Sequence, residues 1–221
     1  MKDRIRGAKP NNQTNSPFAR WWNAVSDSIR EWQRHTILKV IFLISALAAL
    51  LGSPLQSMLA SFTSNKTGQL ATYQIAYYAG AVFSNIFAVW FSKRSQNGVL
   101  DRHPWVAPII LGSFTVIFAQ FSNFPLRLTA LFLGGGAYAW SRLVAVNYTH
   151  QLIPKSHIAR VLALYYLFQH ASIALAGVLA GTLALSKWGV TGSLSLIGLT
   201  LAGISASMGF ASFIRVRPTD A

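Results

Sequence analysis

Apart from Lys39 and Arg127, which stand within three residues of the start of a stretch, only two side chains within the apolar stretches of this sequence could carry a charge. They are Arg142 and His170, and Gln169 stands directly before the histidine. A charge at the centre of a bilayer costs roughly 2.5–3.5 kcal/mol, and less near the end of a span, where a long side chain reaches the interface. Arg142 is therefore interpreted either as an anchor at the polar end of its span or as a gate or substrate contact. For His170 the alternatives are a hydrogen bond between helices and a proton-carrying or ligand role.

Uncharged polar side chains form a second group of candidates. Polar side chains in membrane helices usually face protein or a water-filled cavity. Two interpretations remain open, namely hydrogen bonding between helices and the lining of a substrate cavity. The residues concerned are Gln56, Tyr73, Gln74, Tyr77, Tyr78 and Asn85, of which Gln56, Gln74, Tyr77 and Asn85 are the candidates for a cavity or gate.

The sequence offers no pattern typical of a catalytic centre. It contains no cysteine, which excludes disulfides, thiolate metal sites and a cysteine nucleophile. The histidines are scattered, and all five acidic residues lie outside the apolar stretches, at Asp3, Asp27, Glu31, Asp101 and Asp220. We therefore expect no enzymatic activity, no metal and no cofactor. The usual intramembrane carboxylate of a proton-coupled carrier is also missing.

Composition indicates an integral membrane protein. Of the 221 residues, 52% are hydrophobic and only 11% are charged, and the mean hydropathy is +0.40. The net charge is +14, but the cations occur in an N-terminal segment and in short connections between apolar stretches. This distribution favours an anionic membrane surface over a nucleic-acid partner.

The N-terminal part divides into a tail and an amphipathic helix. Residues 1–15 are basic and polar and are predicted to be disordered. Ser16 followed by Pro17 is typical of a helix start, so residues 16–35 are predicted to form a helix. Its apolar face would contain Phe18, Trp21, Trp22, Val25, Ile29 and Trp32. Tryptophans opposite arginines favour a helix at the headgroup level of a bilayer, although packing on a soluble partner is the alternative.

Residues 36–214 are predicted to form an all-α membrane domain of six spans. Each apolar stretch is bounded by a polar connection, and the first is expected to be retained rather than cleaved as a signal peptide. Pro54 should face protein rather than lipid. The expected spans cover about 37–62, 70–91, 105–121, 126–146, 161–185 and 190–214, followed by a tail at 215–221.

Glycines are predicted to let helices approach closely in two of these spans. Three are consecutive, and two stand four residues apart in the small-xxx-small register. They are Gly134, Gly135 and Gly136, and Gly177 with Gly181.

The distribution of cations predicts the orientation. With six spans, 16 of the 19 Lys and Arg residues fall on the side of both termini, and Lys66, Arg127 and Lys187 fall on the other. The positive-inside rule therefore places both termini in the cytoplasm. We expect an inner or plasma membrane of the bacterial type.

Several stretches together resemble a known family. They are Arg-Glu-Trp-Gln-Arg-His at 30–35, Gly-Ser-Pro at 52–54, Gly80, Lys93-Arg94, and the connection that contains Ser141-Arg142, Gln151, Pro154 and Arg160. Over roughly residues 18–214 the chain resembles the C-terminal six-helix half of the major facilitator superfamily, most closely the siderophore and macrolide exporter branch. Gln151, Pro154, Arg160, Lys93 and Arg94 would belong to its cytoplasmic loops.

The resemblance implies half of a carrier, built as an inverted repeat of three plus three spans. Such a half would pair with a second six-span half, either another copy or a separate chain, and export small molecules by alternating access. The alternative is an accessory or scaffold subunit that uses its aromatic surfaces and interfacial helix to contact other membrane proteins. In both cases the lipid bilayer is a partner.

Overall fold

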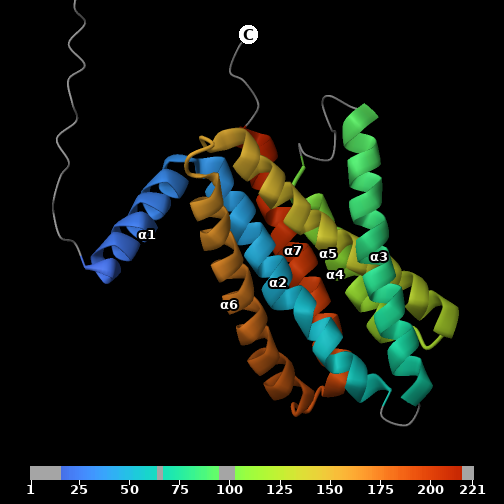
Figure 1. Ribbon diagram of the computed structural model, residues 1–221. Coiled ribbons are helices and arrows are strands. Elements are labelled where there is room, and N and C mark those ends of the chain that lie inside the picture. The colour runs from blue at the N-terminus through green and yellow to red at the C-terminus, as the bar shows by residue number, and fades with distance from the viewer. Residues whose placement is uncertain (1–15, 64–66, 95–102, 216–221) are drawn as a thin grey trace, which may run out of the picture.

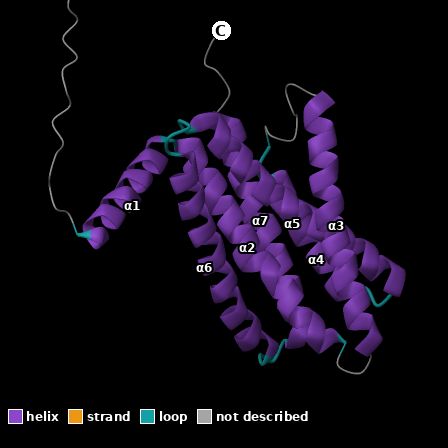
Figure 2. Cartoon of the chain, viewed as in Figure 1, coloured by secondary structure: helices purple, strands orange, loops and turns teal. Residues whose placement is uncertain are grey.

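The computed structural model describes residues 16–63, 67–94 and 103–215, and within these ranges every regular element is an α-helix (Figure 2). The predicted tails at 1–15 and 216–221 lie outside the described residues. Seven helices follow one another in the described part (Figure 1): α1 Pro17–Arg34, α2 Thr36–Phe62, α3 Thr67–Arg94, α4 Val106–Gln120, α5 Phe124–Leu152, α6 Ile158–Ala184 and α7 Gly189–Arg215.

The predicted amphipathic helix is confirmed as α1. Ser16 Oγ accepts a hydrogen bond from the Ala19 N–H at 3.2 Å, and Pro17 occupies the first turn, as expected for an N-terminal cap. His35 has extended backbone angles, so α1 ends there and α2 leaves in a new direction (Figure 1). The second half of α1 packs on α6 and α2: Ser28 is buried, and the ring of Trp32 lies 5.8 Å from Phe168 of α6 and 6.0 Å from Phe42 of α2, measured between centroids.

The break predicted at 142–160 is shorter than the sequence indicated. The fourth span was expected to end near Val146, but α5 continues to Leu152, so only residues 153–157 connect it to α6. Pro154 explains the end point, because a proline disfavours helical angles at the residue before it, and Ile153 is extended. Arg142 therefore lies well inside a helix rather than one turn from its end.

Three helices are long and apolar enough to cross a membrane, so the expectation of six spans is met in part. They are the stretches Thr36–Ala60, Ile158–Ala184 and Gly189–Phe210. The shorter α4 has 15 residues, which is about 22 Å against a hydrocarbon core of ~30 Å. The other two helices, α3 and α5, contain many polar residues, including Gln74 and Asn85 in the first and Arg127 and Arg142 in the second.

The six helices α2 to α7 pack in a regular pattern of pairs. The main neighbour of α3 is α5, that of α6 is α2, and that of α4 is α7, while α2 and α5 also touch each other. Between α3 and α6 the described residues make no contact, and these helices lie at opposite sides of the bundle (Figure 1). Pro54 is buried within α2, as predicted.

Two crossings between helices depend on glycine. A Cβ on Gly80 of α3 would meet the backbone oxygen of Phe132 on α5, and a Cβ on Gly135 of α5 would meet that of Tyr77 on α3; both separations would be far below contact distance. Between α4 and α7, Gly112 and Gly198 would each meet the other's backbone oxygen, at 2.5 and 2.6 Å. Backbones touch at these points because no side chain stands between them.

The predicted glycines therefore divide into two groups. Within the triplet, Gly135 comes closest to another helix, at the Tyr77 backbone, and a Cβ on Gly136 would lie 3.3 Å from the Gly80 oxygen. Gly134 is buried, and a Cβ there would make ordinary contacts. Gly177 and Gly181, in contrast, are exposed, and a Cβ on either would meet nothing within 4 Å. The prediction that these two glycines bring helices of this chain together is therefore wrong, because α6 turns Ala176 and Ala180 toward the bundle instead.

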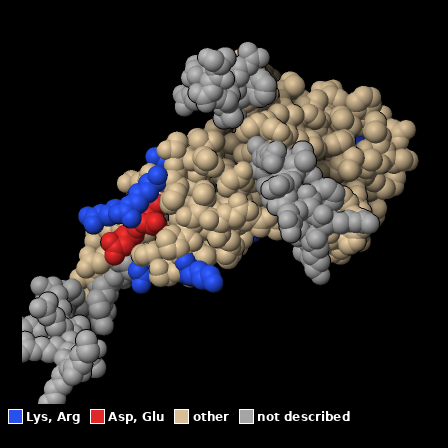
Figure 3. All heavy atoms as spheres, turned by 90° about the horizontal axis from the view of Figure 1, so that it is seen from above, with Lys and Arg blue, Asp and Glu red and all other residues tan. Residues whose placement is uncertain are grey.

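Connections alternate between the two ends of the bundle. The start of α2, the end of α3, the turn between α5 and α6, and the end of α7 all lie at one end (Figure 1). Seen from that end, the described Lys, Arg, Asp and Glu side chains gather mainly around α1, and most of the remaining described surface is free of them (Figure 3). This arrangement matches the alternation that the six expected spans require.

Candidate functional site

Polar side chains from four helices come together inside the bundle, and we call this group the polar cluster. It lies where α2 and α5 are flanked by α3 and α6. Its members are Ser45 of α2, Tyr77 of α3, Tyr138 and Arg142 of α5, and Tyr165 and Gln169 of α6.

Hydrogen bonds link α2 and α6 on one side of the cluster. Ser45 Oγ lies 2.8 Å from Tyr165 Oη, and Gln169 Nε2 donates to the same Ser45 oxygen at 2.8 Å. All three side chains are buried. The Gln169 Oε1 atom has no hydrogen-bond partner in the described part of the chain. The amide thus ties two helices together with its nitrogen and leaves its oxygen unused.

Tyr77 supplies the opposite side of the cluster. It is only 2% exposed, and its hydroxyl has no partner among the described residues. Its ring lies 6.4 Å from that of Tyr138, measured between centroids. The close approach of Gly135 to the Tyr77 backbone holds this side chain against α5. An unpaired buried hydroxyl costs about 1–3 kcal/mol, so its retention points to a role beyond packing.

Arg142 follows Tyr138 by one helical turn on the same face of α5. Its charge is near enough to act on Tyr77, Tyr138 and Tyr165. The side chain is half-buried, and it makes no hydrogen bond or salt bridge with any described residue. Arg142 precedes the end of α5 by ten residues, or about 15 Å along the helix. The polar residues Asn147, Thr149 and His150 lie between Arg142 and the end of α5, so the anchor and the gate both stay predictions for this residue.

Three of the seven predicted cavity or gate residues belong to the polar cluster: Tyr77 and Arg142 lie near Tyr138, and Gln169 is bonded to Ser45. Gln56 is half-buried elsewhere in α2, and the remaining three, Gln74, Asn85 and His170, are exposed. The predicted loop motif is divided: Gln151, Pro154 and Arg160 are exposed around the α5–α6 turn, while Lys93 and Arg94 end α3.

Sequence reasoning missed Ser45, Tyr138 and Tyr165. Serine and tyrosine are common enough in membrane helices that neither stood out. One signal was available, because Tyr138 and Arg142 stand four residues apart and must share a face of a helix. The pairing of Ser45 with Tyr165, 120 positions later in the chain, had no local signal.

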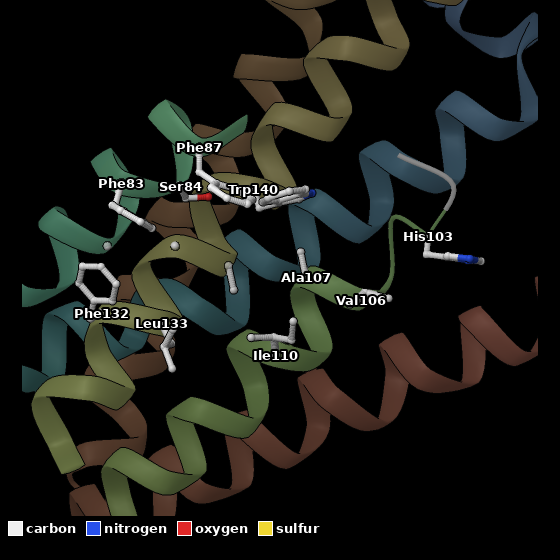
Figure 4. Close-up of a pocket in the computed structure, with 13 residues that line it drawn as sticks. Phe83, Ser84, Phe87, His103, Val106, Ala107, Ile110, Phe132, Leu133 and Trp140 are labelled. Atoms are coloured by element: carbon white, nitrogen blue, oxygen red, sulfur yellow. The ribbon is translucent and has the colours of Figure 1, made fainter. Parts of the chain in front are cut away.

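A second candidate site is a cavity of about 270 Å³ between α3, α4 and α5, which we call the apolar pocket (Figure 4). Phe83 and Phe132 face each other at one end, with their ring centroids 5.8 Å apart, and His103 lies toward the other end. Thirteen residues line the pocket: Gly80, Phe83, Ser84, Phe87, His103, Val106, Ala107, Ile110, Phe132, Leu133, Gly136, Ala137 and Trp140.

The apolar pocket follows from how α3 is held. The glycine crossing fixes α3 to α5, while α3 and α4 make no contact among the described residues. A wedge therefore remains between them. Its walls are almost entirely apolar, which suits an acyl chain or another apolar body. Trp140 and Gly136 line it from the side of α5 opposite Tyr138 and Arg142, so the two sites are separate.

Neither site has the residues of a metal centre: no group of three or more His, Cys, Asp or Glu side chains that could hold an ion occurs within the described ranges. Comparison of the chain with protein-family models, with curated protein sequences and with solved structures found no match.

Proposed function

We propose that this chain is one half of a carrier of the major facilitator type, which pairs with a second six-span unit and exports small molecules by alternating access. The pattern of helix pairs supports this proposal. In an inverted repeat that relates α2, α3 and α4 to α5, α6 and α7, the pair α3 with α5 is equivalent to the pair α6 with α2. The repeat exchanges α4 with α7 and α2 with α5, so each of these two contacts is mapped onto itself.

Six spans are part of the proposal. The three helices that meet the length and composition of a span are α2, α6 and α7. The other three helices are connected to these by packing: α4 lies on α7, and α5 touches α2. The remaining helix, α3, lies on α5. If the first three cross the bilayer, the others cross with them. Both termini then lie on the cytoplasmic side of an inner membrane, where the cations concentrate.

The observation that carries the proposal is a polar stripe on each flanking helix. On α3, Gln74, Tyr78 and Asn85 are exposed and fall within about 40° of one another around the helix; we call them the α3 stripe. On α6, Tyr166, His170, Gly177 and Gly181 are exposed within about 60° and form the α6 stripe.

Lipid is a poor neighbour for such stripes. Polar side chains in membrane helices face protein or water, and exposed glycines permit close approach of another helix. Both stripes therefore favour a second membrane protein unit against α3 and α6. Gly177 and Gly181, which pack against nothing in this chain, would then meet that unit.

The alternative is an accessory or scaffold subunit of a membrane complex. It is favoured by α1, where Phe18 is 70% and Trp22 is 55% exposed on a helix that projects from the bundle (Figure 1). Such aromatic side chains suit a membrane interface or a protein surface equally well. The two functions differ in the partner: a carrier requires a second six-span unit, whereas a scaffold does not.

Cross-linking in native membranes distinguishes them. Because the chain contains no cysteine, Asn85→Cys and His170→Cys can each be labelled with a benzophenone maleimide at a single position. Light should then join both positions to the same partner, and mass spectrometry should identify it as a six-span unit or a copy of this chain. Leu199→Cys, on the exposed face of α7, is the matched control and should give no such adduct.

The outcomes separate the candidates. A six-span partner at both stripes supports the carrier, and Arg142→Ala should then abolish export while leaving membrane insertion intact. Adducts only with proteins that lack six spans would establish the scaffold instead. A chain that remains monomeric in mild detergent and gives no protein adduct contradicts both.

A further inference from the structure

The described charges around Arg142 do not balance. Arg142 is half-buried as a residue, and its guanidinium makes no hydrogen bond or ion pair with the described residues. The sequences of α2 to α7 contain no aspartate or glutamate. The described carboxylates, Asp27 and Glu31, belong to α1, and Glu31 is paired with Arg34 at 2.8 Å. A cation withdrawn from water is costly unless an anion or hydrogen-bond acceptors compensate it.

The remainder of α5 supplies no counter-charge to Arg142, because the ten residues that follow it in this helix include no acidic side chain. The helices α2 to α7 of a second copy would offer no counter-ion either, because they contain no acidic residue. Among the described residues Arg142 is thus left without a counter-charge, which a bound anion would supply.

Neighbouring side chains are arranged as further donors. Tyr77 Oη is buried without a partner, and a phenol hydroxyl that accepts nothing from the protein is free to donate. Tyr138 places a second hydroxyl on the same face of α5 as Arg142. The rings of Tyr77 and Tyr138 lie next to each other, with their centroids 6.4 Å apart.

We propose that Arg142, Tyr77 and Tyr138 form a binding site for an organic oxyanion, with the guanidinium and the hydroxyls contacting a carboxylate or phosphate and the tyrosine rings contacting an apolar or aromatic body. Arginine is suited to this role because its planar fork pairs with two oxygens of such a group. As a statement about which molecules are exported, the inference rests on the proposed function. As a statement about binding, it concerns this chain alone.

The test is a titration of the purified full-length chain in a non-ionic detergent, in which the heat of binding is measured by isothermal titration calorimetry. The probe is 2-naphthoate, an aromatic carboxylate, and its control is 2-naphthamide, which has the same shape without the charge. The chain should bind one naphthoate, at least about tenfold more tightly than naphthamide, because a charge-assisted hydrogen bond is lost in the amide. Equal affinities, or no binding of naphthoate, would overturn the proposal.

Arg142→Gln and Arg127→Gln form a matched pair on α5, and Tyr77→Phe on α3 tests the hydroxyl. Arg142→Gln should weaken naphthoate binding roughly 10- to 100-fold, and Tyr77→Phe by about 3- to 10-fold, with little effect on naphthamide. Arg127→Gln removes an arginine from the same helix, where its Nε donates to the Phe121 oxygen at 2.6 Å, and should leave binding unchanged. Arg142→Lys retains the charge without the fork and should give an intermediate affinity, which guards against misfolding of the glutamine variant.

The natural source of the oxyanion is distinguished in nanodiscs. If a lipid headgroup occupies the site, adding phosphatidylglycerol to phosphatidylcholine discs should weaken naphthoate binding to the unsubstituted chain. If a free anion is the ligand, lipid composition should have no effect. Either result is compatible with the site, whereas an Arg142→Gln chain that binds naphthoate as tightly as the unsubstituted chain would rule it out.

Discussion

Two contacts in this bundle occupy equivalent places in the proposed repeat, yet they are held in opposite ways. Between α3 and α5, Gly80 and Gly135 bring backbone against backbone, so that neither position has room for a Cβ. Between α2 and α6, Ser45, Tyr165 and Gln169 form buried hydrogen bonds. The first contact depends on the absence of side chains, and the second on their chemistry.

The difference indicates which contact tolerates change. Packing of bare backbones has no alternative arrangement, because any added carbon must push the helices apart. A hydrogen-bonded contact can lose one bond and keep the helices in place, and in membranes such bonds contribute modestly, on the order of 0.6–2 kcal/mol each. We therefore expect α3–α5 to be sensitive to size and α2–α6 to be sensitive to polarity.

The largest effect is expected from Gly80→Val. The new side chain would collide with the Phe132 backbone, so α3 must separate from α5, and the free energy of unfolding should fall by about 3 kcal/mol or more. Thermal or denaturant unfolding in detergent measures it. Gly177→Val on α6 is the control, since a Cβ there meets nothing within 4 Å. Similar losses in both variants would show that the crossing does not decide stability.

A smaller effect is expected from Ser45→Ala. The substitution leaves the Tyr165 hydroxyl and the Gln169 nitrogen buried without their shared partner, which should cost about 1–2 kcal/mol. The same unfolding assay measures it. Ser113→Ala removes a hydroxyl that bonds only to its own helix, at the Ile109 oxygen, and should change stability by less than about 0.5 kcal/mol. A loss at Ser113 as large as at Ser45 would contradict a bridging role.

Removing single hydroxyls sharpens the comparison further. Tyr165→Phe breaks the bond to Ser45 and should destabilise the chain by about 1 kcal/mol. Tyr77→Phe removes a buried hydroxyl that has no partner among the described residues, so stability should stay the same or rise slightly. Unfolding without any added anion measures both. Destabilisation by Tyr77→Phe would mean that its hydroxyl is satisfied within the protein, and Tyr77 would lose its assigned role as a donor.

Much of the secondary structure was predictable because its signals are local. The Ser16 cap, the proline that follows it and the polar connections placed the helices near their observed positions. The end of α5 was not, because Asn147, Thr149 and His150 look like a polar break although they form a regular helix. Hydropathy predicts where a chain leaves the lipid, but the helix can continue beyond that point, as α5 does to Leu152.

The polar cluster was only partly predictable. Tyr77, Arg142 and Gln169 stood out as polar groups in apolar stretches, but so did Gln74, Asn85 and His170, which the structure leaves exposed. Nothing along the chain separates the two groups. Whether a polar residue faces inward depends on the rotation of its helix against neighbours that are distant in sequence, as with Ser45 and Gln169, 124 positions apart.

By itself, the sequence determined the helical architecture, the alternation of its connections and the lack of acidic residues in α2 to α7, because these follow from residue types and their order. Only the tertiary structure decided which glycines touch a backbone, which described hydroxyls remain unpaired and which polar side chains are buried together. The reason is geometric. Composition and period are properties of one segment, whereas close approach and unpaired burial are properties of two segments whose relative rotation local sequence does not encode.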